Sequence, residues 1–281
     1  MKKRLLYLGC LCLILSIFSA GCGKEDIIDQ AINNAKDVES VTSNTRLETN
    51  YTVTVNDREK AVDLQSTVRK QYTKEPLATS MQMNMRTNNK TANIITYCVI
   101  EDGKLARYTN RNGQWQKETV SSYYETALSS GTPNNPTLYL EMSRDFTPDS
   151  ENMTEDGDIL KYTAVIPGEN IEAMPEIFGD VKYLLDSLDI DSKDIRGLYK
   201  NAKDIEITFW LDKSTLLLIH YELDMLPFIR SVLTAAQAED IIDQEKQYVI
   251  EKAFAASTLS YNNVEAIEVP DSVKGAANIG K

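Results

Sequence analysis

The sequence lacks most of the residues from which metal and catalytic centres are built. It has one histidine, His220, and four cysteines. Cys10 and Cys12 lie in an N-terminal apolar run, and Cys22 closes a processing motif, which leaves Cys98 as the free thiol. These numbers exclude a His-rich zinc site, a thiolate cluster and an intramolecular disulfide. No Gly-x-Ser-x-Gly elbow or Ser-x-x-Lys motif occurs. The sequence therefore predicts no catalytic residue, no metal and no cofactor.

The chain is also poor in positive charge. It carries 30 Lys and Arg against 42 Asp and Glu, for a formal net charge of −12. Removal of a leader that contains Lys2, Lys3 and Arg4 would take the charge to −15, because no acidic residue leaves with them. This balance argues against a nucleic-acid partner and against adsorption to anionic lipid through a basic face.

The apolar N-terminal run, Leu5 to Phe18, is too short to span a bilayer comfortably. It follows three cations and ends at Ser19-Ala20-Gly21-Cys22, which resembles a bacterial lipobox. We interpret residues 1–21 as a lipoprotein signal peptide and Cys22 as the site of diacylglyceryl attachment. The alternative is an ordinary secretory leader cut near Ala20, with Cys22 an incidental thiol.

Residues 22–26 are expected to form a short tether that reaches only about 13 Å. A single domain over 27–273 and a flexible tail over 274–281 would follow. This arrangement places the domain at the extracytoplasmic face of the cell membrane, held there by lipidated Cys22 as a monomer.

Period-two alternation predicts long antiparallel strands. In one of them Met81, Met83 and Met85 alternate with polar residues. Asp102-Gly103 and Asn112-Gly113 indicate two-residue hairpin turns. Their registers place Tyr97 opposite Tyr108, with Trp115 on the same face.

A further hairpin is expected over 205–225. A three-residue loop, Lys213 to Thr215, would keep both of its apolar sets together and make Trp210 and Leu218 outward neighbours. Apolar residues at helical spacing predict amphipathic helices over 27–38, 171–188 and 226–242.

The order of these elements resembles a family of largely uncharacterised Gram-positive lipoproteins. The resemblance is carried by short stretches at strand ends and turns, namely Lys36-Asp37-Val38-Glu39-Ser40, Glu75-Pro76-Leu77, Gly113-Gln114-Trp115-Gln116-Lys117, Trp210-Leu211-Asp212-Lys213 and Tyr261-Asn262-Asn263. It implies a fold similar to the LolA, LolB and LppX carriers. That fold is α+β, a curved antiparallel β half-barrel with helices packed on its concave face.

Methionine lines adaptable apolar surfaces, so the methionine strand indicates a hydrophobic ligand site. We expect an apolar cavity beneath Met81, Met83, Tyr97 and Tyr108, with the helices 27–38 and 171–188 as lids. The candidate ligand-binding residues are Met81, Met83, Met85, Tyr97, Tyr108 and Trp115.

This site would hold a lipid or a lipidated partner without catalysis. The same residues also fit a filled core. In that case the chain would be an envelope protein-interaction or sensor lipoprotein that uses an outer patch of Trp210 with Leu218.

Overall fold

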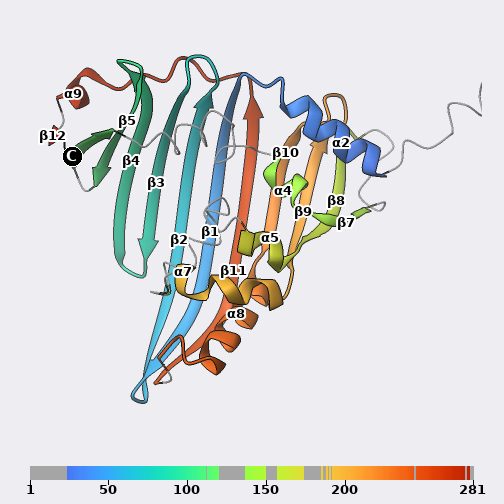
Figure 1. Ribbon diagram of the computed structural model, residues 1–281, viewed down its shortest axis with the longest axis vertical. Helices are drawn as coiled ribbons and strands as arrows, with labels where there is room; N and C mark the ends of the chain where they lie inside the picture. The colour runs from blue at the N-terminus through green and yellow to red at the C-terminus, as the bar shows by residue number, and fades with distance from the viewer. Residues whose placement is uncertain are drawn as a thin grey trace, which may run out of the picture.

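The computed structural model describes residues 24–111, 113–119, 137–149, 157–173, 185, 188, 190, 192–243, 245–275 and 277–278. This part of the chain forms one twelve-stranded sheet that curves around several helices (Figure 1). The strand order is β12-β6-β5-β4-β3-β2-β1-β11-β10-β9-β8-β7. The pairings are antiparallel, apart from the short parallel pair of β12 with β6. The predicted fold class, a curved antiparallel sheet with helices on its concave face, is confirmed.

The strands are β1 (Ser40–Val55), β2 (Arg58–Thr73), β3 (Ala78–Thr87), β4 (Lys90–Glu101), β5 (Lys104–Arg111), β6 (Gln114–Thr119), β7 (Arg144–Pro148), β8 (Ile159–Ile166), β9 (Ile205–Asp212), β10 (Leu218–Asp224), β11 (Lys246–Tyr261) and β12 (Ala277–Asn278). The helices are α2 (Lys24–Ala35), α4 (Leu138–Glu141), α5 (Gly168–Ala173), α7 (Ser192–Ile195), the 3₁₀ helix η2 (Arg196–Asn201), α8 (Leu226–Ala238) and α9 (Asp271–Lys274).

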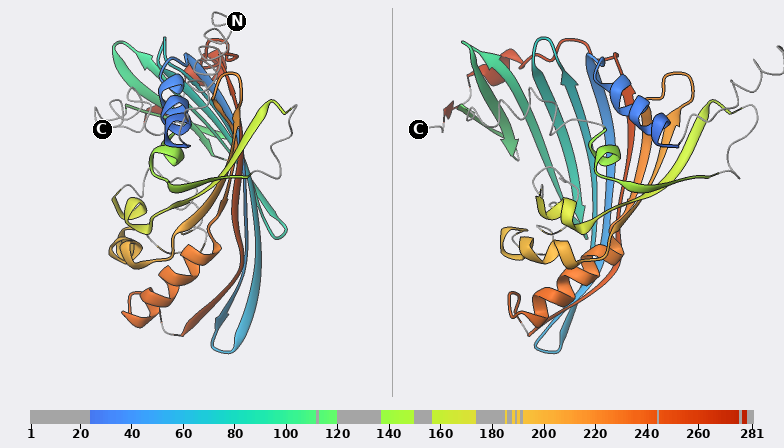
Figure 2. Two further views of the ribbon diagram at one scale, coloured as in Figure 1. Left: turned by 90° about the vertical axis from the view of Figure 1, so that its right-hand side faces the viewer. Right: turned by 45° about the vertical axis from the view of Figure 1, so that its right-hand side comes forward.

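Alternating side chains give the sheet two different faces. On β9, Ile205, Ile207, Phe209 and Leu211 are buried while the residues between them are at least partly exposed. The buried set joins α2, α8 and the concave side of the neighbouring strands in one large core. Figure 2 shows α2, α5 and α8 on this side of the sheet. The other side is the outer, convex face.

The predicted helices agree with the structure in part. The helix expected over 27–38 is α2, which ends at Ala35 and buries Ile28 and Ala31. The helix expected over 226–242 is α8, which ends at Ala238. Of the range 171–188, residues 171–173 belong to α5, and Leu185 and Leu188 are buried. The remainder of that range lies outside the described residues.

The β9–β10 loop corrects one prediction. It has four residues, 213–216, because the Asp212 N–H donates to the Leu217 carbonyl over 2.9 Å. The Asp212 carboxylate accepts the backbone N–H groups of Ser214 and Thr215 at 3.0 and 2.8 Å, which stabilises the longer turn.

The fourth loop residue shifts the pairing of β10 with β9 by one residue relative to the prediction. An irregularity between Leu218 and His220 shifts it by one more. The two shifts together keep Tyr221 and Leu223 in the core and leave Trp210 on the outer face. Leu218, however, lies opposite Leu211 and is buried, so its predicted outward position is wrong.

Replacement of Phe209 tests the concave core. Phe209 is fully buried, with ring centroids 5.7 Å from Phe146 and 6.3 Å from Tyr162. Phe209→Ala should lower the free energy of unfolding in denaturant by about 3–5 kcal/mol. The adjacent, outward Thr208→Ala should change it by no more than about 0.5 kcal/mol. Equal losses in the two variants would contradict this assignment of faces.

Candidate functional site

The predicted ligand-binding residues lie on two different faces of the sheet. Met83 pairs with Val68 of β2, a member of the concave core. Met81 pairs with Thr96, the residue before Tyr97 in β4. Paired residues share a face and sequence neighbours do not, so Tyr97 points outward. The expected single cavity beneath the methionines and the tyrosines is therefore wrong.

The methionines lie on the concave face. Met81 and Met83 are half-buried and pack against the margin of the main core, while Met85 is half-buried further along β3. The described helices make their main sheet contacts elsewhere, α2 with β7 and α8 with β9 and β11. The methionine strand thus lies beside the helix-covered half of the concave face.

A buried hydroxyl lies next to the methionines. Ser66 of β2 sits between Leu47 and Met85 in the register and is 1% exposed. Its Oγ has no hydrogen-bond partner in the part of the chain that the structure describes. A buried polar atom without a partner is unfavourable. The hydroxyl has less than 1 Å² of exposed surface, so a ligand reaches it only when the side chains around it move.

The aromatic residues form a cluster on the outer face. The Tyr97 and Trp115 rings stack with centroids 5.9 Å apart. The pairing of Tyr97 with Tyr108, which the Asp102-Gly103 turn predicted, is confirmed. The predicted placement of Trp115 on the same face is confirmed as well. Tyr108 is buried because Val269 and Val273 from the C-terminal end of the chain pack on it.

Residues 262–274, which we call the strap, therefore cross the outer face. One end is fixed at β1, where the Asn262 N–H donates to the Ser40 carbonyl over 2.8 Å. The other end is fixed by Val269 and Val273 in the aromatic cluster. Sequence reasoning missed this cover, although two valines four residues apart in a polar segment indicate a docked apolar pair. Beyond the strap, β12 pairs with β6, within the range expected to be a flexible tail.

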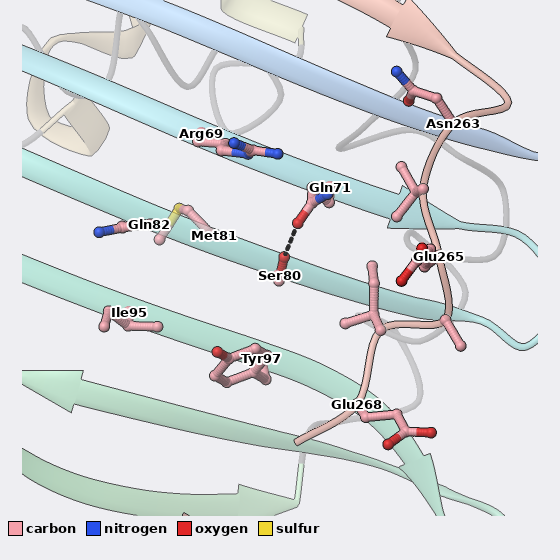
Figure 3. A pocket seen from close by; sticks show the side chains of 13 residues that line it. Arg69, Gln71, Ser80, Met81, Gln82, Ile95, Tyr97, Asn263, Glu265 and Glu268 are labelled. Carbon is pink, nitrogen blue, oxygen red and sulfur yellow. Dashed lines mark hydrogen bonds between the residues drawn. The ribbon is translucent and has the colours of Figure 1, made fainter. Parts of the chain in front are cut away.

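A hollow of about 590 Å³ lies between the strap and the sheet (Figure 3). Its walls are mainly polar, in contrast to the apolar cavity that the sequence predicted. The Ser80 hydroxyl donates to the Gln71 side-chain oxygen over 3.3 Å across its floor. The residues that line it from the sheet are the outward Arg69, Gln71, Ser80, Gln82, Ile95 and Tyr97, together with Met81, whose side chain packs on the concave face. The strap contributes Asn263 to Glu268.

A charged group stands beside the aromatic cluster. The Tyr108 hydroxyl donates to Glu101 at 2.7 Å, and the Lys117 ammonium lies 2.6 Å from the same carboxylate and 5.1 Å from the Tyr108 ring centroid. The hydrogen bond from Lys117 lowers the pKa of Glu101, and the carboxylate in turn raises the pKa of Lys117.

A family of unknown function (DUF6612) matches residues 23–278. The chain belongs to this family. No curated protein matches it.

Among solved structures, this DUF6612 chain is similar to the Mycobacterium tuberculosis lipoprotein LppX, at 11% identity and a TM-score of 0.41, over 88% of this chain and 100% of that one. It is also similar to a DUF1329 protein from Desulfovibrio piger, at 7% identity and a TM-score of 0.24, over 86% and 94% of the two chains. A third is a Vibrio parahaemolyticus domain described as a putative outer membrane lipoprotein-sorting protein, at 6% identity and a TM-score of 0.22, over 85% and 95%.

In the described part of this DUF6612 protein, no three His, Cys, Asp or Glu side chains are grouped so that they could hold a metal ion. None of the helices placed in the structure is both long and apolar enough to cross a bilayer. Cys22 and the leader before it lie outside the described residues.

Replacement of Glu101 tests the charged group. Because the pKa of Glu101 is lowered from its ordinary value of 4.5, the carboxylate stabilises the fold fully above that pH. This stabilisation is lost as the pH falls through the lowered, folded-state pKa. The free energy of unfolding, measured from pH 7 to 3, should be higher for wild type than for Glu101→Gln at neutral pH. This difference between the two proteins should become smaller as the pH falls. The exposed Glu251→Gln is the control, and an unchanged difference at pH 3 would contradict the assignment.

Proposed function

We propose that this protein is an extracytoplasmic lipoprotein, anchored to the cell membrane through lipidated Cys22, that binds a hydrophobic ligand without catalysis. The ligand would be a lipid or a lipidated partner, held between the concave face of the sheet and its helices. The observation that supports this most directly is the half-buried pair Met81 and Met83 at the margin of the main core.

Apolar burial alone can supply the affinity for such a ligand. Each buried methylene contributes about 0.8 kcal/mol, and methionine side chains adapt to chains of irregular shape. Once the side chains that cover it move aside, the Ser66 hydroxyl beside Met85 would donate to an ester or carbonyl oxygen near the head of the ligand.

The alternative, a protein-interaction or sensor lipoprotein with a filled core, has less support. It relied on an apolar outer patch of Trp210 and Leu218, and Leu218 is buried. Trp210 is instead set among polar groups, with the Lys161 ammonium 5.4 Å from its ring centroid and the His220 ring 4.7 Å away.

Substitution at Met83 tests ligand binding. The full chain, extracted from membranes in mild detergent, should carry non-covalent lipid detectable by native mass spectrometry. Met83→Asn should reduce this lipid several-fold, because a polar amide would replace an apolar contact on the concave face. Asn84→Ala, the next residue but outward, is the control. Thermal melting followed by circular dichroism shows whether both variants remain folded.

Two results would overturn the concave-face site. One is a wild-type chain that never carries lipid. The other is a folded Met83→Asn variant that retains as much lipid as wild type.

Substitution at Cys22 tests the anchor. Cys22→Ala should either block processing or release the processed protein from the membrane fraction, because the thioether-linked chains would be missing. Fractionation with incorporation of labelled fatty acid measures both. A processed Cys22→Ala protein that still sediments with membranes would refute the anchor while leaving the ligand site open.

A further inference from the structure

The outer face of β3 and β4 is rich in uncharged polar side chains. Charged residues make up 26% of the chain, but Arg86 is the one charged residue among the outward positions from Ala78 to Arg86 and from Thr91 to Val99. Those positions are Ala78, Ser80, Gln82, Asn84, Arg86, Thr91, Asn93, Ile95, Tyr97 and Val99. The next outward position of β4, Glu101 at the end of the strand, is paired with Lys117. Amides and hydroxyls both donate and accept hydrogen bonds, so this face suits a ligand that does the same.

The same face has two hollows along the same three strands. The first is the 590 Å³ space beneath the strap. The second, of about 550 Å³, is bordered by Gln65, Thr67, Asn84 and Asn93, with Asn93 donating to the Asn84 side-chain oxygen over 2.6 Å. Tyr97 in the first and Asn93 in the second are four residues apart on β4, which is about 13 Å along a strand. The two hollows form a polar track along the strands.

We propose that this track binds a neutral carbohydrate chain that passes beneath the strap. A sugar residue presents hydroxyls, which the amides of Gln71 and Gln82 and the hydroxyl of Ser80 can bond. It also has a flat apolar C–H face, which suits the half-buried ring of Tyr97, held in place by stacking on Trp115. Figure 3 shows Gln71, Ser80, Gln82 and Tyr97 on neighbouring strands of the sheet, with the strap beside them.

The charges around the track favour a neutral ligand. Arg69 stands on the sheet side of the first hollow, while Glu265 and Glu268 stand on the strap. Arg86 borders the second hollow, where it donates to Gln65 and lies 4.0 Å from Asp63. The two glutamates would repel a phosphate backbone. A lipid would leave the polar walls without partners, which is unfavourable. The site is on the opposite face from the concave lipid site and does not depend on it.

An extended peptide fits this face less well. A peptide usually adds to a sheet by pairing with an exposed strand edge, and β2, β3 and β4 are each paired on both sides. The strap residues 265–268 make no backbone hydrogen bond with other described residues. Their N–H and carbonyl groups could pair with a peptide over a short length, so the experiment below also tests peptide binding.

Binding of defined oligosaccharides to the full chain tests the proposal. The two probes are maltotetraose and the tetramer of N-acetylglucosamine, each titrated at up to millimolar concentration and followed by saturation-transfer NMR and calorimetry. At least one should bind. Gln82→Ala and Tyr97→Leu should each weaken it about tenfold.

Two variants serve as controls for the saccharide titration. Thr208→Ala, outward on the distant β9, should bind like wild type. Met83→Asn, adjacent to Gln82 but on the concave face, should also leave saccharide binding unchanged while it lowers lipid retention. These two readouts separate failure of the outer site from failure of the concave one.

Three results would overturn the carbohydrate proposal. They are no binding of either probe to the folded chain, undiminished binding by folded Gln82→Ala and Tyr97→Leu, and binding of an uncharged extended octapeptide in place of the sugars.

Discussion

The register of one continuous antiparallel sheet is the constraint on which the rest of this structure depends. β1 is paired along its length with β2 on one side and β11 on the other. Because side chains alternate along every strand, this pairing decides for the whole sheet which residues meet the helices and which point outward. A slip of one residue would exchange the two sets, bringing Thr and Gln into the core and exposing Val and Leu.

The two faces are then covered by different parts of the chain. α2 and α8 cover the concave side of the strands from β7 to β11, where the sheet contributes to the main core. The strap covers part of the outer side of β2 to β5, where Val269 and Val273 bury Tyr108. Each cover matches the chemistry beneath it, since the helices meet an apolar surface and most of the strap spans a polar one.

Much of this could be predicted from the sequence because turns and alternation are local signals. The Asp102-Gly103 turn, with positive φ at both residues, gave the correct pairing of Tyr97 with Tyr108. To predict that Met81 and Tyr97 lie on opposite faces, the turn between β3 and β4 must be recognised as well. Asn88 and Asn89 connect Thr87 to Lys90 directly, with φ of +50° at Asn88. That two-residue turn sets the methionines opposite even-numbered residues of β4, and an Asn-Asn pair is a weaker signal than Asp-Gly. The strap could not be predicted, because its docking depends on contacts far apart in sequence.

The two proposed sites are connected at one end of β1 rather than through the sheet. β3 carries Met83 and Gln82 on opposite faces, but it is paired on both sides and cannot rotate without breaking two ladders. The segment between α2 and β1 contacts the strap directly. There the Glu39 N–H donates to the Asn262 side chain over 2.9 Å, and Ser40 accepts the strap's Asn262 N–H. A movement of α2 would therefore reach the strap through two hydrogen bonds, and by thermodynamic reciprocity a movement of the strap would reach α2. A substitution on one face that leaves α2 and the β3 ladders in place therefore does not reach the other face.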